Sequence, residues 1–233
     1  MRGWGWGVVV ALLAGGCGPT SAEVFGEELF NDPRLSPSSF NTFSCATCHS
    51  TRATPPEDKL HTGLSLYGAA SRPTWWGGYE TRLLDAVNFC YTAFMRATVP
   101  LSEDDPKSRA LYEYLVSISP ERQAPTQPFT LVRDIEEVPR GSTTRGEQVY
   151  RAACEECHGA VRTGAGRLTS LAPVLPDVTR EYGQLFPGTA PSLVFIEKVR
   201  HGRFFGVGGN MPPYSLEALS DEDLGALLAW LGL

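Results

Sequence analysis

Apolar residues recur at helical spacing in two stretches, one near the middle of the chain and one at its C-terminus. Asp105 followed by Pro106 suits the N-cap and first turn of a helix. Ser220 with Asp223 three positions later suits a second helix start. The apolar positions are Ala110, Leu111, Tyr114 and Leu115 in the first stretch and Leu224, Leu227, Leu228 and Leu231 in the second. Because alternation with period two is scarce throughout, the pattern predicts an all-α fold.

These two helices each close one half of a degenerate internal repeat. Gly26-x-x-x-Phe30 opens the first half and Gly146-x-x-x-Tyr150 opens the second, each on a short helical stretch. Between the halves, residues 119–140 carry four prolines among polar residues, a composition typical of linkers. We therefore expect two all-α domains, at residues 22–118 and 141–233, joined by a Pro-rich linker at residues 119–140.

Charge narrows the choice of partners. The 233 residues include 20 Lys and Arg against 26 Asp and Glu, which gives a net charge of −6. A surface that follows nucleic-acid phosphates needs the opposite sign, so we expect no nucleic-acid binding. A basic redox partner protein would be attracted instead.

Residues 1–16 have the pattern of a lipoprotein signal peptide. Arg2 precedes an apolar run at residues 8–14, and small residues lead directly to Cys17. The run is shorter than the roughly 20 residues of a membrane span. It departs from a bacterial lipobox because Ala14 occupies the position three before the cysteine, which is usually a larger apolar residue, and a plain secretion signal is the alternative. We expect a lipid on Cys17 that anchors the protein to a membrane of the periplasm or cell envelope.

Four further cysteines fall in two copies of a C-x-x-C-H motif. The copies are Cys45-Ala-Thr-Cys48-His49 and Cys154-Glu-Glu-Cys157-His158. In an exported protein this spacing indicates attachment of haem c: the two thiols form thioethers and the histidine is the proximal iron ligand. A four-cysteine zinc site would not require histidine after both pairs, and a redox-active disulfide is expected near a βαβ pattern, which is absent. The motifs predict two covalently bound haems c, with His49 and His158 ligating iron.

With its motif and terminal helix, the second half resembles class I cytochromes c along nearly its full length. In that fold, an N-terminal helix with the glycine and an aromatic residue crosses the C-terminal helix, where Trp230 stands here and Tyr114 stands in the first half. Two such cytochrome c-like domains, each around one haem, are the fold that the resemblance implies.

The resemblance also implies a distal methionine ligand, and Met211 is the only methionine of the second half. Pro212 and Pro213 follow it and hold the backbone extended, so its thioether can project without disturbing a helix. One alternative is a methionine that fills a gap in the core. The other is ligation by His201, although this residue precedes Gly202 and suits the C-terminus of a helix.

In the first half, His61, Cys90 and Met95 are the candidates for the distal iron ligand. Leu83, Val87, Cys90 and Phe94 lie on one apolar face of a helix predicted at residues 82–96. Cys90 should therefore face the interior, whereas Met95 is rotated by about 140° from it if the helix continues. Met95 returns as a candidate if the helix ends earlier.

Residues 75–115 resemble the haem domain shared by thiosulfate dehydrogenases and the diheme subunit of sulfur-oxidising complexes. A Trp-containing segment, a helix with Cys90 followed five positions on by Met95, and the terminal helix carry the likeness. It implies a cysteine thiolate on the iron and a small inorganic sulfur anion as substrate. Those enzymes have an arginine one turn before the cysteine, and Ala86 stands there instead.

A weaker resemblance is to bacterial diheme cytochrome c peroxidases. It rests on residues 26–36 together with the first C-x-x-C-H motif, and on His61 preceding Arg72 and Pro73. Those peroxidases are substantially longer. Because His61 lies near Pro56 and Lys59 in the sequence, the alternative to iron ligation is that it is an exposed histidine in a loop.

These observations favour one-electron transfer between redox partners as the function. Oxidation or reduction of a sulfur anion at the first haem is the enzymatic alternative, and a peroxidase is a more distant one. Cys90 carries most weight in this choice, because it is the only thiol left once Cys17 and both motifs are modified. Simple burial in the core is the alternative to iron ligation for this thiol.

Overall fold

The computed structural model of the chain describes residues 21–205 and 209–233, so the predicted signal peptide at residues 1–16 and Cys17 lie outside the described residues. The α-helices are α1 (Ser21–Asn31), α2 (Cys45–Cys48), α3 (Leu83–Ala93), α4 (Pro106–Ser117), α5 (Thr143–Val149), α6 (Glu155–His158), α7 (Asp177–Glu181), α8 (Pro191–Phe205) and α9 (Asp221–Leu231). Shorter helical turns are η1 (Pro33–Leu35), η2 (Ala69–Ser71), η3 (Trp76–Gly78), the π-helical η4 (Tyr150–Cys154) and η5 (Tyr182–Gln184).

The expected all-α fold is confirmed. Within the described residues, the only β feature is an isolated bridge between Trp75 and Glu80. None of the helices that the structure describes has both the length and the apolar character needed to cross a membrane.

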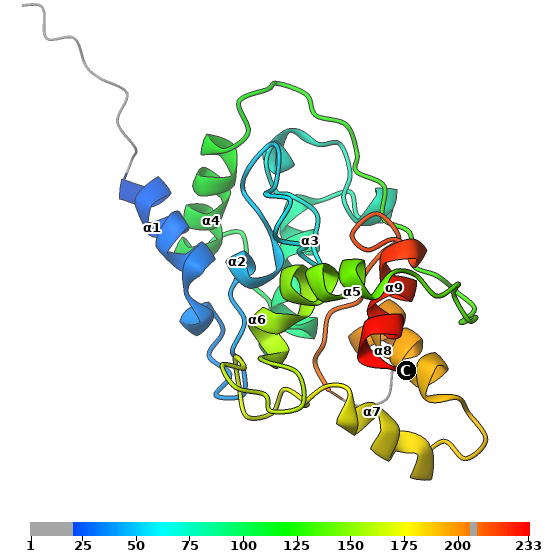
Figure 1. Cartoon of the computed structure of the whole chain (residues 1–233). Helices are drawn as coiled ribbons and strands as arrows, with labels where there is room; N and C mark the ends of the chain where they lie inside the picture. The colour runs from blue at the N-terminus through cyan, green and yellow to red at the C-terminus, as the bar shows by residue number, and fades with distance from the viewer. Residues whose placement is uncertain (1–20, 206–208) are drawn as a thin grey trace, which may run out of the picture.

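One helix pair closes each half of the repeat, and Figure 1 shows α1 beside α4 and α5 beside α9. A Cβ added to Gly26 would lie 2.8 Å from Tyr114 Cβ, and one added to Gly146 would lie 2.6 Å from Trp230 Cβ. Glycine is required at both crossings because the helix backbones approach closely there.

Aromatic contacts complete each crossing four residues beyond the glycine. The rings of Phe30 and Tyr114 are 5.3 Å apart, and those of Tyr150 and Trp230 are 5.0 Å apart. Both halves therefore use the same Gly-x-x-x-aromatic device that the sequence repeat indicated.

The predicted caps define the starts of the two terminal helices. The Asp105 carboxylate accepts the N–H of Lys107 over 2.8 Å, with Pro106 in the first turn of α4. Ser220 Oγ accepts the N–H of Asp223 over 3.1 Å at the start of α9. Each cap satisfies a backbone donor that the helix itself leaves unpaired.

Two separate hydrophobic cores underlie the two halves. Phe30, Leu35, Tyr91 and Leu111 are among the residues that form the first. The second forms around Tyr150, Phe195, Tyr214, Leu224 and Leu228, and partly buried side chains of residues 60, 135 and 138 pack against it. The second core thus also contacts the first half and residues 119–140, which contain no helix.

Candidate functional site: two C-x-x-C-H motifs and an apolar cavity

The first motif is held by a short capped helix. Ser44 Oγ accepts the N–H of Thr47, and Thr47 Oγ1 accepts the N–H of Ser44, which makes a capping box for α2. His49 follows directly in an extended conformation, and its Nδ1 donates to the carbonyl of Leu64 over 2.8 Å. Since a carbonyl can only accept, this bond places the proton on Nδ1 and leaves the Nε2 lone pair available.

The second motif repeats this arrangement on a different local backbone. It runs from the π-helical turn η4 into α6, at whose end lies His158. Here too, the imidazole Nδ1 donates to the carbonyl fifteen residues later, that of Pro173, over 2.9 Å. The spacing is the same as between His49 and Leu64, so both histidines present Nε2 in the form that binds a metal.

Burial keeps both imidazoles neutral. It lowers the pKa of His49 and of His158 below the ordinary value, and the hydrogen bonds to carbonyls oppose this only in part. A neutral ring retains the lone pair that an iron ligand needs.

The motif thiols lie in apolar surroundings. Burial raises the pKa of Cys45 and of Cys154 to about 12 and that of Cys157 to about 11, and the pKa of Cys48 also rises. In the parts of the chain that the structure describes, no three His, Cys, Asp or Glu side chains converge on a metal site.

An apolar cavity opens beside the first motif. It has an empty volume of about 1200 Å³, which includes open space at its mouth. Its walls include Cys45, Cys48 and His49, with Cys90 and Met95 also lining it. The aromatic lining residues are Phe43, Trp75, Trp76, Tyr91, Phe94 and Phe129.

Two sulfur atoms remain candidates for the distal iron ligand, because α3 ends at Ala93 rather than at residue 96. Arg96 has a left-handed φ of 58°, and the N–H of Ala97 donates to the carbonyl of Tyr91 over 3.1 Å. Within this turn, Met95 is 4% exposed and lines the cavity together with Cys90. Cys90 is partly buried, and burial followed by the neighbouring Cys45 raises the pKa of its thiol to about 12.

The chain just after His61 contacts the imidazole of His49. A Cβ added to Gly63 would collide with the His49 ring, and the carbonyl of Leu64 accepts from that ring. The segment directly after His61 therefore packs against the proximal imidazole. His61 itself does not line the cavity.

A haem fits the chemistry of this cavity in one further respect. Arg72 lines it and is 9% exposed, and its Nη2 donates to the carbonyls of Ser65 and Tyr67 over 2.9 and 2.7 Å. Both acceptors are uncharged, so the buried guanidinium lacks a carboxylate partner among the described residues. A haem carries two propionates, and a buried cation of this kind is suited to them.

In the second half, Met211 is partly buried against the core. It approaches α8 closely, because a Cβ at Gly202 would lie 2.5 Å from the Met211 carbonyl oxygen, and Gly202 has a φ of 52°. His201 is already engaged at both ring nitrogens: Nε2 contacts the carbonyl of Val132 at 2.7 Å and Nδ1 contacts Glu197 at 2.7 Å. These contacts favour Met211 over His201 as a distal ligand.

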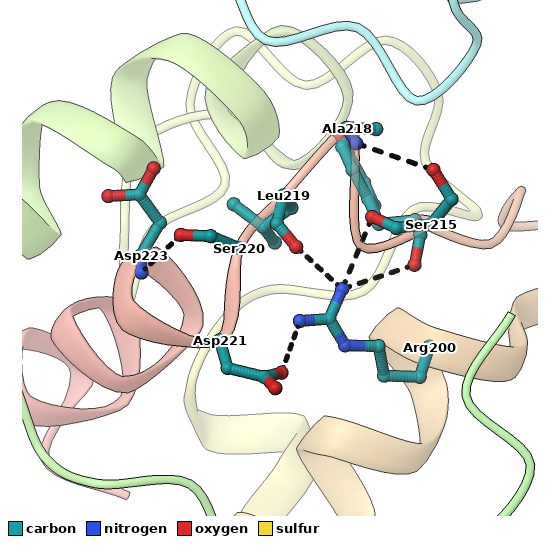
Figure 2. A network of polar contacts seen from close by, with 8 residues as sticks. Arg200, Ser215, Ala218, Leu219, Ser220, Asp221 and Asp223 are labelled. Carbon is teal, nitrogen blue, oxygen red and sulfur yellow. Dashed lines mark hydrogen bonds and ion pairs between the residues drawn. The ribbon is translucent and has the colours of Figure 1, made fainter. Parts of the chain in front are cut away.

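Arg200 fixes the chain that follows Met211, as Figure 2 shows. Its side chain is 1% exposed and donates through Nη1 to the carbonyls of Leu219, Tyr214 and Ser215 over 2.7, 3.2 and 3.4 Å. Its Nη2 pairs with Asp221 at 2.6 Å. One side chain on α8 thus holds residues 214–221 in place.

Several residues of the first cavity were missed by sequence reasoning. Gln127 and Phe129 come from residues 119–140, and Pro212 and Pro213 come from the second half. The Phe129 ring lies 5.0 Å from the ring of Trp76. Phe129 is the single aromatic residue of the Pro-rich stretch, and this could have indicated that it packs against one of the halves.

Two family models match the chain. Residues 141–231 match cytochrome c oxidase, cbb3-type, subunit III, and residues 20–96 match di-haem cytochrome c peroxidase. No curated protein matches the chain. A similar solved structure is the thiosulfate dehydrogenase (TsdBA) from Marichromatium purpuratum in its as-isolated form, at 18% identity and a TM-score of 0.44. The match covers 90% of this chain and 45% of that one, so this chain spans less than half its length.

The two family matches agree with the expected all-α fold with cytochrome c-like halves, and they imply covalently bound haem c with haem-based electron transfer or redox activity. The chain joins a half that matches the di-haem cytochrome c peroxidase family to a half that matches the cbb3-type subunit III family, and both are families of cytochromes c.

Proposed function

We propose that this protein is a diheme cytochrome c that transfers single electrons between redox partners. The observation that carries the proposal is the repeated histidine geometry: in each motif, Nδ1 donates to a carbonyl fifteen residues later. The arrangement supports one haem on Cys45 and Cys48 and another on Cys154 and Cys157. When bound, haem iron supplies a one-electron couple between its ferric and ferrous forms.

The ligand sets we propose would give the two sites different potentials. His49 and Cys90 would hold the first iron, with Met95 as the competing sulfur, and His158 and Met211 would hold the second. A thiolate stabilises ferric iron and a thioether favours ferrous iron. Electrons would therefore enter at the first site and leave at the second.

A sulfur-anion oxidoreductase at the first site is the alternative, and the position of Cys90 on the cavity wall is the observation that favours it. Substrate anions would require a cation near this thiol. Ala86 lines the cavity one turn before Cys90, and Arg72 is the only Lys or Arg among the described residues of its lining. If Arg72 pairs with the haem propionates, the described lining has no further cation to bind a substrate anion. We therefore favour the electron carrier.

The remaining proposals rest on the sequence. Residues 1–17 support export with a lipid on Cys17, which would hold the protein at a membrane of the periplasm or cell envelope. The net charge of −6 supports basic redox proteins as partners.

Haem counting tests the proposed function. Wild type should give two haems per chain in the pyridine haemochrome assay, and Cys154→Ala/Cys157→Ala should give one. The matching pair Cys45→Ala/Cys48→Ala should remove the other haem. Two haems remaining in either double variant would contradict the assignment. Turnover of thiosulfate or tetrathionate with an artificial acceptor or donor would establish the enzymatic alternative.

A further inference from the structure

A short segment of the first half connects the two C-x-x-C-H motifs. The N–H of Gly63 donates to the carbonyl of Cys48 over 2.9 Å. Three residues earlier, the N–H of Leu60 donates to the carbonyl of Ala152 in η4, also over 2.9 Å, and the Leu60 side chain packs against the second core. The two motifs are thus joined through residues 60–63, far more directly than through residues 119–140.

An ion pair lies at the outer side of this junction. Lys59 Nζ is 2.6 Å from the carboxylate of Glu156, which stands between the two cysteines of the second motif. Both side chains are well exposed, so water screens the pair and it contributes little to holding the two motifs together. Figure 1 shows α2 and α6, which carry the two motifs, near each other at the centre of the molecule. Buried contacts must hold this arrangement.

Tyr214 is the buried side chain at the junction. It is 4% exposed, its hydroxyl donates to the carbonyl of Ala153 over 2.6 Å, and the hydroxyl also lies 3.5 Å from the carbonyl of Leu60. Burial raises the pKa of Tyr214 well above its ordinary value. Through the carbonyls of Ala153 and Leu60, Tyr214 contacts the segments that adjoin both motifs.

We propose that Tyr214 is a positioning residue for electron exchange between the two haem attachment sites. The proposal rests on the proposed function, because it requires a haem on each motif. In each exchange, one site loses one electron and the other gains it, and no bond forms or breaks. Electron tunnelling weakens steeply with separation, so a side chain that fixes the spacing of two attachment sites controls the rate of exchange.

Tyr214→Phe tests this role, because it keeps the ring and removes the hydroxyl. Tyr150→Phe is the matched control: Tyr150 is also buried and donates to a carbonyl of the second half, that of Gly159, over 2.6 Å. A photoexcited ruthenium complex would inject one electron, and absorbance would follow its passage between the haems. Rates that do not depend on protein concentration report exchange within one molecule. The magnetic interaction between the two ferric haems, measured by electron paramagnetic resonance, reports their spacing independently.

We expect Tyr214→Phe to keep both haems and both ligand sets, to exchange electrons more slowly than wild type, and to show a weaker magnetic interaction. Tyr150→Phe should keep the wild-type rate. Equal rates for Tyr214→Phe and wild type, or equal slowing in both variants, would overturn the role of Tyr214.

Two further results have defined meanings. If Tyr214→Phe binds fewer than two haems, Tyr214→Leu replaces it, since leucine also lacks the hydroxyl, and an unchanged rate again refutes the role. One haem in the wild-type chain overturns the proposed function itself. Two haems in wild type with no effect of Tyr214 overturn only this inference.

Discussion

Replacing Arg200 with methionine should destabilise the segment that follows Met211. Methionine retains most of the buried stem but removes every donor. The bonds at 3.2 and 3.4 Å are long and contribute little, so the main loss is the 2.7 Å bond to the carbonyl of Leu219, a residue that is 2% exposed. A charged donor to such a carbonyl contributes about 1.5–3 kcal/mol, and leaving the carbonyl unpaired adds to the cost.

The Asp221 side of this network should contribute less. Its side chain is 54% exposed, so water screens the ion pair, and Asp221→Asn should cost about 0–1 kcal/mol. For Arg200→Met we expect a loss of about 3 kcal/mol, which corresponds to a decrease of roughly 6–12 °C in melting temperature for a chain of this size.

Thermal unfolding of the haem-loaded protein checks both values. The weak long-wavelength absorption band of a methionine-ligated ferric haem should disappear at a lower temperature in Arg200→Met, because this segment directly follows the candidate ligand Met211. If Asp221→Asn costs as much as Arg200→Met, the ion pair rather than the carbonyl contacts holds the segment, and the reasoning is refuted.

Two more changes test the iron ligands, and a third tests an exposed hydrogen bond. Cys90→Ala should abolish the low-spin thiolate signal in electron paramagnetic resonance and raise the potential of the first haem. If Cys90 is only a core residue, its replacement should lower the stability by about 1–2 kcal/mol and leave the spectrum intact. If only Met95→Ala changes the spectrum, Met95 is the ligand. Met211→Ala should remove the long-wavelength band and lower the potential of the second haem, whereas an unchanged spectrum would point to His201. The exposed Glu217 carboxylate accepts hydrogen bonds from the N–H and hydroxyl of Thr130 over 2.9 and 2.7 Å. Desolvation raises its pKa, but these bonds together with those from its own backbone and from Ser215 outweigh it and lower the pKa from 4.5 to about 2. Because the folded-state pKa is lower than the unfolded one, this stabilisation is present above pH 4.5 and is lost as the pH falls toward 2. Glu217→Gln should therefore lose less stability than wild type over that range in an acid titration followed by circular dichroism, and parallel curves would contradict the assignment.

The sequence alone determined those features that depend on neighbouring residues. The caps at Asp105 and Ser220 bond to backbone groups two or three positions away, and a C-x-x-C-H motif places two thiols and an imidazole within five positions. The glycines at 26 and 146 were recognisable because the repeat presents the same device twice. Such local patterns can be interpreted without knowing how distant segments of the chain pack together.

Only the tertiary structure decided which distant groups share a cavity. Helical periodicity turned Met95 away from Cys90, but the left-handed turn at Arg96 ends α3 early and brings both sulfurs to the same wall. Phe129 from the Pro-rich segment and Pro213 from the second half complete that wall. Their positions follow from packing between segments far apart in the sequence, which no local pattern encodes. For the same reason, the junction at Tyr214 became visible only once both halves were folded together.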